Sequence, residues 1–314
     1  MAFGEYLATE VAVDYADGLM PRREALRRLA LLGVGAATAA SMLSACSDDG
    51  GGASTSTSTS TSNSNNTGTS TSSVSGDSTT TTPPTVNGTP ATKISFPGPA
   101  SDLIGYLADI DSPRGAVLII HENRGLTPHF EQLPSRFAAA GYSALSIDLL
   151  SRIGGTASLS DDGAATAALG TARQSDLTAD AKAGLDELAR RHRDVPLAVI
   201  GFCFGGAQVW ALLASGEPRL SAAVPFYGPG PTDPDFSGSA DAAVLGIYAE
   251  RDSRVNASKD AMDAALTRAG VVHEMKVFPG VDHAFFNDTG ARYDATQAAA
   301  AFDAVLAWFG DHLV

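Results

Sequence analysis

A cysteine between two glycines is the residue of this chain with the clearest chemical potential. Cys203 stands in Gly201-Phe202-Cys203-Phe204-Gly205, between an apolar run over 196–200 that predicts a buried strand and a helix expected over 207–215. A nucleophile at such a sharp strand-to-helix turn has a strained backbone, and the residues two positions away must then be small. We therefore predict that Cys203 is the nucleophile of a nucleophile elbow, and the alternative is a buried structural cysteine.

The helix after Cys203 is expected to act on the sulfur directly. Its amide donors and positive dipole end would lower the thiol pKa and favour a thiolate. The backbone N–H of Phe204 would be one donor to an oxyanion.

A thiol with an unperturbed pKa is only slightly ionised near neutral pH, so a base and an orienting acid are needed. Asp252 follows the strand expected over 243–248, and His283 follows the next one, expected over 274–278. Loops at the carboxyl ends of parallel strands converge, so we predict a Cys203, His283 and Asp252 triad. Asp282 is the alternative acid, and Asp252 could instead be a loop acid paired with Arg251 or Arg254.

The order nucleophile, acid, base is that of α/β-hydrolases, which predicts a mostly parallel central sheet with helices on both faces. Helices are expected over 130–140, 176–192, 258–269 and 295–312, and a hairpin at the sheet edge over 93–110. We expect no long lid over the site.

With these three residues in place, residues 93–314 resemble the dienelactone hydrolase family, also called carboxymethylenebutenolidases, which uses a cysteine nucleophile. Family members carry a glutamate where Glu122 stands, and the resemblance implies that Glu122 takes the thiol proton when substrate enters. It also implies that the backbone N–H of Asn123 is the second oxyanion donor. Glu122 could instead be a charged loop residue that pairs with Arg124.

Arg152 matches the position of an arginine that binds the substrate carboxylate in this family, a task that suits a planar guanidinium. A solvent-facing arginine is the alternative. The second such arginine of the family, a few residues after the histidine, is replaced here by the segment Phe285-Phe286-Asn287.

The N-terminus has the features of an export signal. Arg22-Arg23 and Arg27-Arg28 precede an apolar stretch over 29–43 that is short for a spanning helix, and we predict a twin-arginine signal peptide over 1–45. Leu43-Ser44-Ala45-Cys46 resembles a bacterial lipobox, which implies that Cys46 is lipidated and anchors an extracytoplasmic protein to the membrane. The alternative is a plain N-terminal helix with an incidental cysteine.

Residues 46–92 are rich in serine and threonine and have too few apolar residues to form a core, so we predict a disordered tether before the catalytic domain over 93–314. The net charge of −14 disfavours nucleic-acid binding. No phosphate loop and no cysteine-pair metal motif occurs, so we expect neither a cofactor nor a metal.

The leading interpretation is a membrane-tethered hydrolase of lactones or carboxylic esters that acts as a monomer or small homo-oligomer on a small molecule. Three alternatives stay open: a general carboxylesterase of the cell envelope, a non-catalytic envelope lipoprotein that binds a ligand, and a thiol-based redox sensor.

Overall fold

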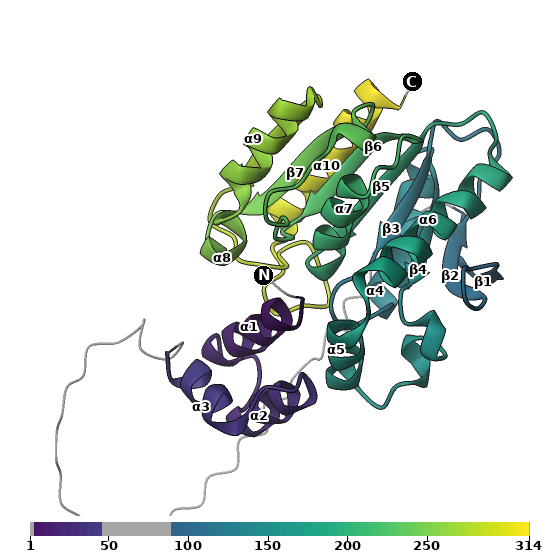
Figure 1. Ribbon diagram of the computed structural model, residues 1–314. Helices are drawn as coiled ribbons and strands as arrows, with labels where there is room; N and C mark the ends of the chain where they lie inside the picture. The colour runs from purple at the N-terminus through teal and green to yellow at the C-terminus, as the bar shows by residue number, and fades with distance from the viewer. Residues whose placement is uncertain (1–2, 46–88, 314) are drawn as a thin grey trace, which may run out of the picture.

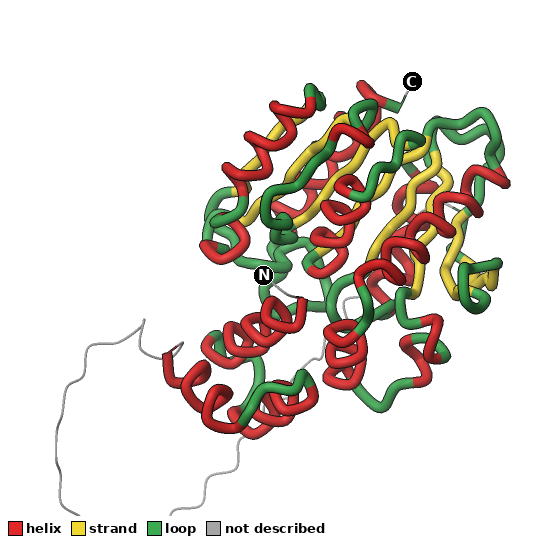
Figure 2. Tube along the Cα trace, in the orientation of Figure 1, coloured by secondary structure: helices red, strands yellow, loops and turns green. Residues whose placement is uncertain are grey.

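The structure is a computed structural model that describes residues 3–45 and 89–313. Cys46 and most of the expected tether over 46–92 lie outside the described residues. The described chain forms a mixed sheet covered by helices, with three further helices at the N-terminus (Figures 1 and 2).

Eight strands of the described residues form one sheet in the order β1-β2-β4-β3-β5-β6-β7-β8. β1 and β2 form the expected antiparallel hairpin, β2 is antiparallel to β4, and the strands from β4 to β8 are parallel. Their bounds are β1 Thr92–Phe96, β2 Leu103–Ala108, β3 Ala116–Ile120, β4 Ser143–Asp148, β5 Leu197–Phe202, β6 Leu220–Phe226, β7 Ala243–Ala249 and β8 His273–Phe278.

The inner strands are apolar along their whole length because helices bury both faces of the sheet. Every residue of β3, β5 and β7 is buried. The helices are α4 Pro128–Ala139, α5 Asp162–Thr171, α6 Gln174–Arg191, α7 Phe204–Ala214, α8 Ser253–Asn256, α9 Lys259–Ala269 and α10 Ala295–His312.

The two faces are covered by different helices. On one face α4 packs against α10, where the ring of Phe137 lies 5.2 Å from that of Phe302. α6 and α7 contact each other on the other face and lie in front of the sheet in Figure 1, with α10 behind it. This is the α/β-hydrolase arrangement that the sequence predicts.

Three helices precede the sheet: α1 Phe3–Ala16, α2 Arg22–Leu31 and α3 Ala36–Ala45. They bury a small apolar cluster of their own that contains Val11, Leu29 and Leu43. α1 and α2 also pack against α5, and Tyr6 and Leu7 of α1 join the main core (Figure 1). No helix of residues 3–45 or 89–313 has both the length and the apolar character required to cross a bilayer.

The segment predicted as a signal peptide is therefore helical and in contact with the catalytic domain in this structure. The sequence analysis gave it no place in the fold. Its assignment as an export signal stays a prediction, and so does lipidation of Cys46.

Candidate active site

Cys203 occupies a strained turn between β5 and α7. Its φ of 55° and ψ of −115° lie outside the regions that most side chains adopt, and its amide donates to the carbonyl of Phe226 at 3.0 Å. A Cβ on Gly201 would lie 2.2 Å from the carbonyl oxygen of Gly205, and one on Gly205 would lie 2.3 Å from that of Ile120. Both glycines are thus required by close backbone approach, as the elbow predicts.

Asp252 and His283 meet across the loops that follow β7 and β8. The Nδ1 atom of His283 lies 2.5 Å from Oδ2 of Asp252, and both side chains are buried. Asp252 also accepts from the Val255 amide and so caps α8, which fixes its carboxylate in place. Asp282 points elsewhere, because it pairs with Arg251 at 3.4 Å and leaves about half of its side chain exposed.

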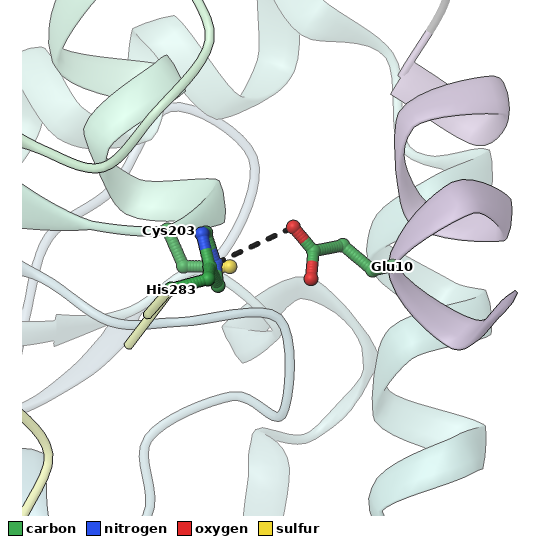
Figure 3. A group of neighbouring side chains, drawn as sticks. All are labelled: Glu10, Cys203 and His283. Atoms are coloured by element: carbon green, nitrogen blue, oxygen red, sulfur yellow. Dashed lines mark ion pairs between the residues drawn. The ribbon is translucent and has the colours of Figure 1, made fainter. Parts of the chain in front are cut away.

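Cys203 and His283 lie within reach of each other. The Cys203 sulfur and a ring nitrogen of His283 are within 4.8 Å, together with a carboxylate oxygen of Glu10 (Figure 3). Thiolate, imidazole and carboxylate are also zinc ligands. Here, however, Glu10 already forms an ion pair with His283, and this pair accounts for the proximity of the two side chains.

Glu122 lies at the end of β3 and lines the same cavity as Cys203. Its carboxylate accepts from the hydroxyl of Tyr227 at 3.2 Å and from the amide of Asn287 at 2.9 Å. Asn287, in the segment that follows His283, thus holds the glutamate. Arg124 does not pair with Glu122 but approaches Asp14 and Asp162.

The segment after β3 lies directly against the elbow. A Cβ on Gly205 would also lie 2.6 Å from the His121 carbonyl oxygen, so the backbones that carry Asn123 and Phe204 approach closely. The ring of His121 fixes this loop, because it bonds the Glu122 carbonyl through Nδ1 at 2.7 Å and accepts the Leu149 amide at 3.1 Å.

Arg152 lies outside this group of residues, contrary to the expectation that it binds substrate. It is not among the residues that line the Cys203 cavity, and its guanidinium forms a two-point contact with Asp180 at 2.7 and 2.8 Å. Because Asp180 on α6 is 1 % exposed, it needs a counter-charge, and Arg152 supplies it. The structure thus gives Arg152 a structural contact.

Two residues of α1 reach the catalytic atoms. Oε1 of Glu10 lies 3.3 Å from Nε2 of His283, and the hydroxyl of Tyr6 lies 3.4 Å from the sulfur of Cys203 (Figure 3 shows Glu10). Arg254 forms an ion pair with Glu10, lies 3.8 Å from Asp252, and stacks 4.9 Å over the Tyr6 ring.

The same helix lines part of the cavity, whose volume is about 300 Å³. Asp14 and Asp17 pair with Arg292 at 2.9 and 2.5 Å. The cavity wall accordingly includes residues of α1 as well as Cys203 and His283.

These contacts set the protonation of the site. Burial lowers the pKa of His283, but the charges of Glu10 and Asp252 outweigh it, so the pKa lies well above its ordinary value. Burial raises the pKa of the Cys203 thiol, and Glu10 adds to the effect. With α1 in place the thiol pKa is thus raised overall, whatever the position of the sulfur at the start of α7 contributes.

Sequence reasoning found the residues that follow strands and missed those of α1. Tyr6, Glu10 and Asp14 recur every four residues, which places them on one helix face. This four-residue spacing predicts a shared helix face, but it falls within the segment that the arginine pairs and the apolar stretch predict to be an export signal. Arg292 had no sequence signal that linked it to the site.

Comparison with known proteins agrees with the fold. The model of the dienelactone hydrolase family matches residues 103–313. A protein of Escherichia coli K12 named "Putative carboxymethylenebutenolidase" is 30 % identical over 230 residues, covering 68 % of this chain and 84 % of the relative. "Protein usf" of Aquifex pyrophilus is 31 % identical over 219 residues, covering 67 % and 93 %.

Among solved structures, one titled "Putative Dienelactone Hydrolase" from Klebsiella pneumoniae superposes with a TM-score of 0.62 at 28 % identity, over 70 % of this chain and 98 % of that one. The dienelactone hydrolase-like promiscuous phosphotriesterase P91 from metagenomic libraries gives a TM-score of 0.60 at 26 % identity, over 71 % and 98 %. From its sheet, its nucleophile elbow and these matches, this chain belongs to the dienelactone hydrolase family.

Proposed function

We propose that this hydrolase cleaves carboxylic esters or lactones with Cys203 as nucleophile, His283 as base and acid, and Asp252 as the group that orients the imidazole. The observation that carries the proposal is the 2.5 Å contact of Asp252 with Nδ1 of His283, whose other nitrogen faces the buried sulfur at the elbow. An aspartate on Nδ1 fixes the tautomer whose Nε2 can accept a proton, and it stabilises the imidazolium that forms.

The reaction divides into two acyl transfers. The thiol proton goes to Nε2 of His283 while the sulfur attacks the carbonyl carbon, and the amides of Phe204 and Asn123 hold the oxyanion. The C–O bond to the alcohol then breaks, and the imidazolium returns its proton to the leaving oxygen. Water, deprotonated by His283, attacks the thioester, releases the carboxylic acid and restores the thiol.

Glu122 has a proposed part in starting this sequence. The raised thiol pKa keeps Cys203 protonated at rest, which protects the sulfur from oxidation. Glu122 is an alternative to His283 as the acceptor of the thiol proton when substrate enters, because it lines the same cavity and accepts from the neutral groups of Tyr227 and Asn287.

A general carboxylesterase is the second candidate, and the position of Arg152 favours it. The arginine expected to select an anionic substrate is engaged with Asp180 instead. The two candidates differ in the ratio of kcat/KM between an anionic lactone and a neutral ester of similar size.

The decisive experiment is hydrolysis of a panel of lactones, aryl esters and an aryl phosphotriester by the full chain, by Cys203→Ala and by His283→Ala. Because Glu10 contacts His283, each assay is repeated with Glu10→Gln in the same chain. Loss of about a thousandfold or more in kcat for carboxylic esters in both variants is expected. Turnover that survives either substitution would refute the triad.

We also propose that residues 1–45 direct export and that Cys46 is lipidated, which the arginine pairs and the segment Leu43-Ser44-Ala45-Cys46 support. The test is mass spectrometry of the mature N-terminus in a bacterial host. A lipidated Cys46 is expected, and an intact Met1 in the exported protein would contradict it.

A further inference from the structure

Helix α1 occupies the position that a substrate needs. The carbonyl carbon of an ester must contact the Cys203 sulfur, and its leaving oxygen must face Nε2 of His283. In this structure the Tyr6 hydroxyl lies 3.4 Å from that sulfur, and a carboxylate oxygen of Glu10 lies 3.3 Å from that nitrogen (Figure 3). Each of the two reacting atoms is therefore in contact with a side chain of α1, which stands beside the cavity that they line.

We infer that α1 is an intramolecular inhibitor, so that the chain with its N-terminal helices in place is a latent form of the enzyme. The statement that α1 inhibits the enzyme rests on the proposed function. The docking of α1 over Cys203 can nevertheless be tested without any turnover.

The contacts that hold α1 are charged and specific. Acidic residues of α1 and of the turn after it meet basic residues of the domain in two places: Glu10 pairs with Arg254, and Asp14 and Asp17 pair with Arg292. Glu10 is 3 % exposed and Asp14 8 %, so the pairs that these two residues form are largely removed from water, where attraction between charges is strong.

Apolar burial and a second helix add to this docking. Tyr6 and Leu7 are buried in the main core. Arg27 of α2 pairs with Asp161 at the start of α5 at 3.0 Å. This contact anchors the helices α1 to α3 to the domain at a second point, away from Cys203 and His283.

The electrostatics of the docked form also oppose catalysis. The carboxylates of Asp252 and Glu10 raise the pKa of the imidazole, which favours the imidazolium, a form that cannot take the thiol proton. The thiol in turn stays neutral because burial raises its pKa. Departure of α1 removes one of the two carboxylates and opens the sulfur to solvent, so both groups return toward their reactive forms.

The inhibitory helix α1 and the position at which it would be released belong to the same chain. α1 to α3 join the catalytic domain only through the segment that begins at Cys46, which is also the expected processing position. Cleavage before Cys46 would detach the inhibitor from the domain. Latency of the precursor and activity of the processed enzyme would then follow from a single cut.

The test uses the full chain in a Cys46→Ser background, so that Cys203 is its one remaining cysteine. Two readouts are taken: the second-order rate of Cys203 alkylation by iodoacetamide, and kcat/KM for the best ester of the panel. The variants are Asp14→Asn/Asp17→Asn, which changes no group that touches the catalytic atoms, and Glu10→Gln. Glu5→Gln is the matched control, because it makes the same change on an exposed position of the same helix.

We expect both test variants to raise the alkylation rate and kcat/KM at least tenfold, and the control to change neither by more than about twofold. Equal alkylation rates in the parent and in both test variants would overturn the inference. If alkylation rises and no ester is cleaved, α1 docks as inferred and the proposed function fails. If the parent already cleaves ester as fast as the variants, the proposed function stands and the inference fails.

Discussion

At the scale of single residues, the site depends on which charges are paired and which are free to change partner. Asp252 is committed to His283 and to the start of α8, whereas Glu122 is held only by the neutral donors Tyr227 and Asn287. The two acids are therefore held in different ways: Asp252 faces a histidine, and Glu122 faces neutral hydrogen-bond donors.

The first prediction separates the two neighbouring acids of the sequence. Asp252→Asn removes the carboxylate on Nδ1 and should lower kcat by about 10³ to 10⁴, because the imidazole is no longer fixed in the reactive tautomer. Asp282→Asn should leave kcat within about twofold, since Asp282 pairs with Arg251 at the surface. Steady-state kinetics of both variants with one ester checks this, and equal losses would show that the orienting acid is misassigned.

The second prediction concerns Arg152. Arg152→Ala should destabilise the fold by roughly 3 kcal/mol, because it leaves the buried Asp180 carboxylate without its partner. Anionic and neutral esters should be affected alike. Thermal unfolding measures the loss of stability, and the double variant Arg152→Ala/Asp180→Asn should recover most of that stability. A selective rise in KM for anionic esters would instead return Arg152 to the substrate site.

At the scale of elements, the turn between β5 and α7 and the helix α1 have opposite roles. The turn brings the sulfur to the carboxyl edge of the sheet at the cost of a strained backbone. α1 covers the same edge with a face on which Tyr6, Glu10 and Asp14 repeat at helical spacing. One element positions the proposed nucleophile and the other covers it.

A third prediction tests the elbow. Gly205→Ala should lower stability by on the order of 2–4 kcal/mol, because its Cβ would overlap the Ile120 carbonyl and neither backbone segment can move freely. Gly280→Ala is the control: its φ of 69° is unfavourable for alanine, but its Cβ meets nothing within 4 Å, so roughly 1–2 kcal/mol is expected. Chemical denaturation measures both, and a smaller loss for Gly205→Ala than for Gly280→Ala would contradict the packing.

A fourth prediction is that docking of α1 depends on pH. Burial raises the pKa of Glu10, but His283 and Arg254 outweigh it, so the pKa is lowered from 4.5, whereas that of His283 is raised above 6.5. The stabilisation from Glu10 is present above 4.5 and disappears as pH falls through its lowered pKa. That from His283 is present below 6.5 and disappears as pH rises through its raised pKa. Cys203, Asp252 and Tyr6 also face this pair.

Docking should therefore weaken at acid pH, where Glu10 is protonated, and at alkaline pH, where His283 loses its proton. The measurement is the ratio of Cys203 alkylation rates between Asp14→Asn/Asp17→Asn and the parent, because this ratio cancels the ionisation of the thiol itself. We expect the ratio to fall between about pH 6 and pH 9.5. A ratio of alkylation rates that rises with pH would contradict the predicted direction of the pH dependence.

At the scale of the whole molecule, the described chain has two apolar cores of very different size. The large one lies on both faces of the sheet, and the small one lies among α1, α2 and α3. A core as small as the second gives little stability by itself, so its helices depend on contact with the domain. The N-terminal unit is thus able to leave without unfolding the sheet.

The fifth prediction follows from this separation. Leu29→Ala removes a fully buried side chain from the small cluster and should destabilise it by about 2–5 kcal/mol. Amide hydrogen exchange should speed up in α1 to α3 and stay unchanged in β5, with a parallel rise in Cys203 alkylation. Faster exchange in β5 would show that the two parts unfold together.

Much of the catalytic domain follows from local sequence. Apolar runs of strand length, the glycines around Cys203 and the loop positions of Asp252 and His283 are determined within a few residues each. A parallel sheet then brings strand ends to one edge, so a site could be predicted without coordinates. The helix over 295–312 was likewise predictable from its apolar stripe.

What the tertiary structure decided is which charges meet. Arg152 pairs with Asp180 rather than facing the cavity, and Glu10 reaches His283 from 273 positions away in a segment whose local pattern indicates export. Pairing between distant side chains depends on how helices pack, and no local periodicity encodes it. Burial then fixes the protonation of the sulfur and the imidazole, because desolvation exists only once the chain has folded around them.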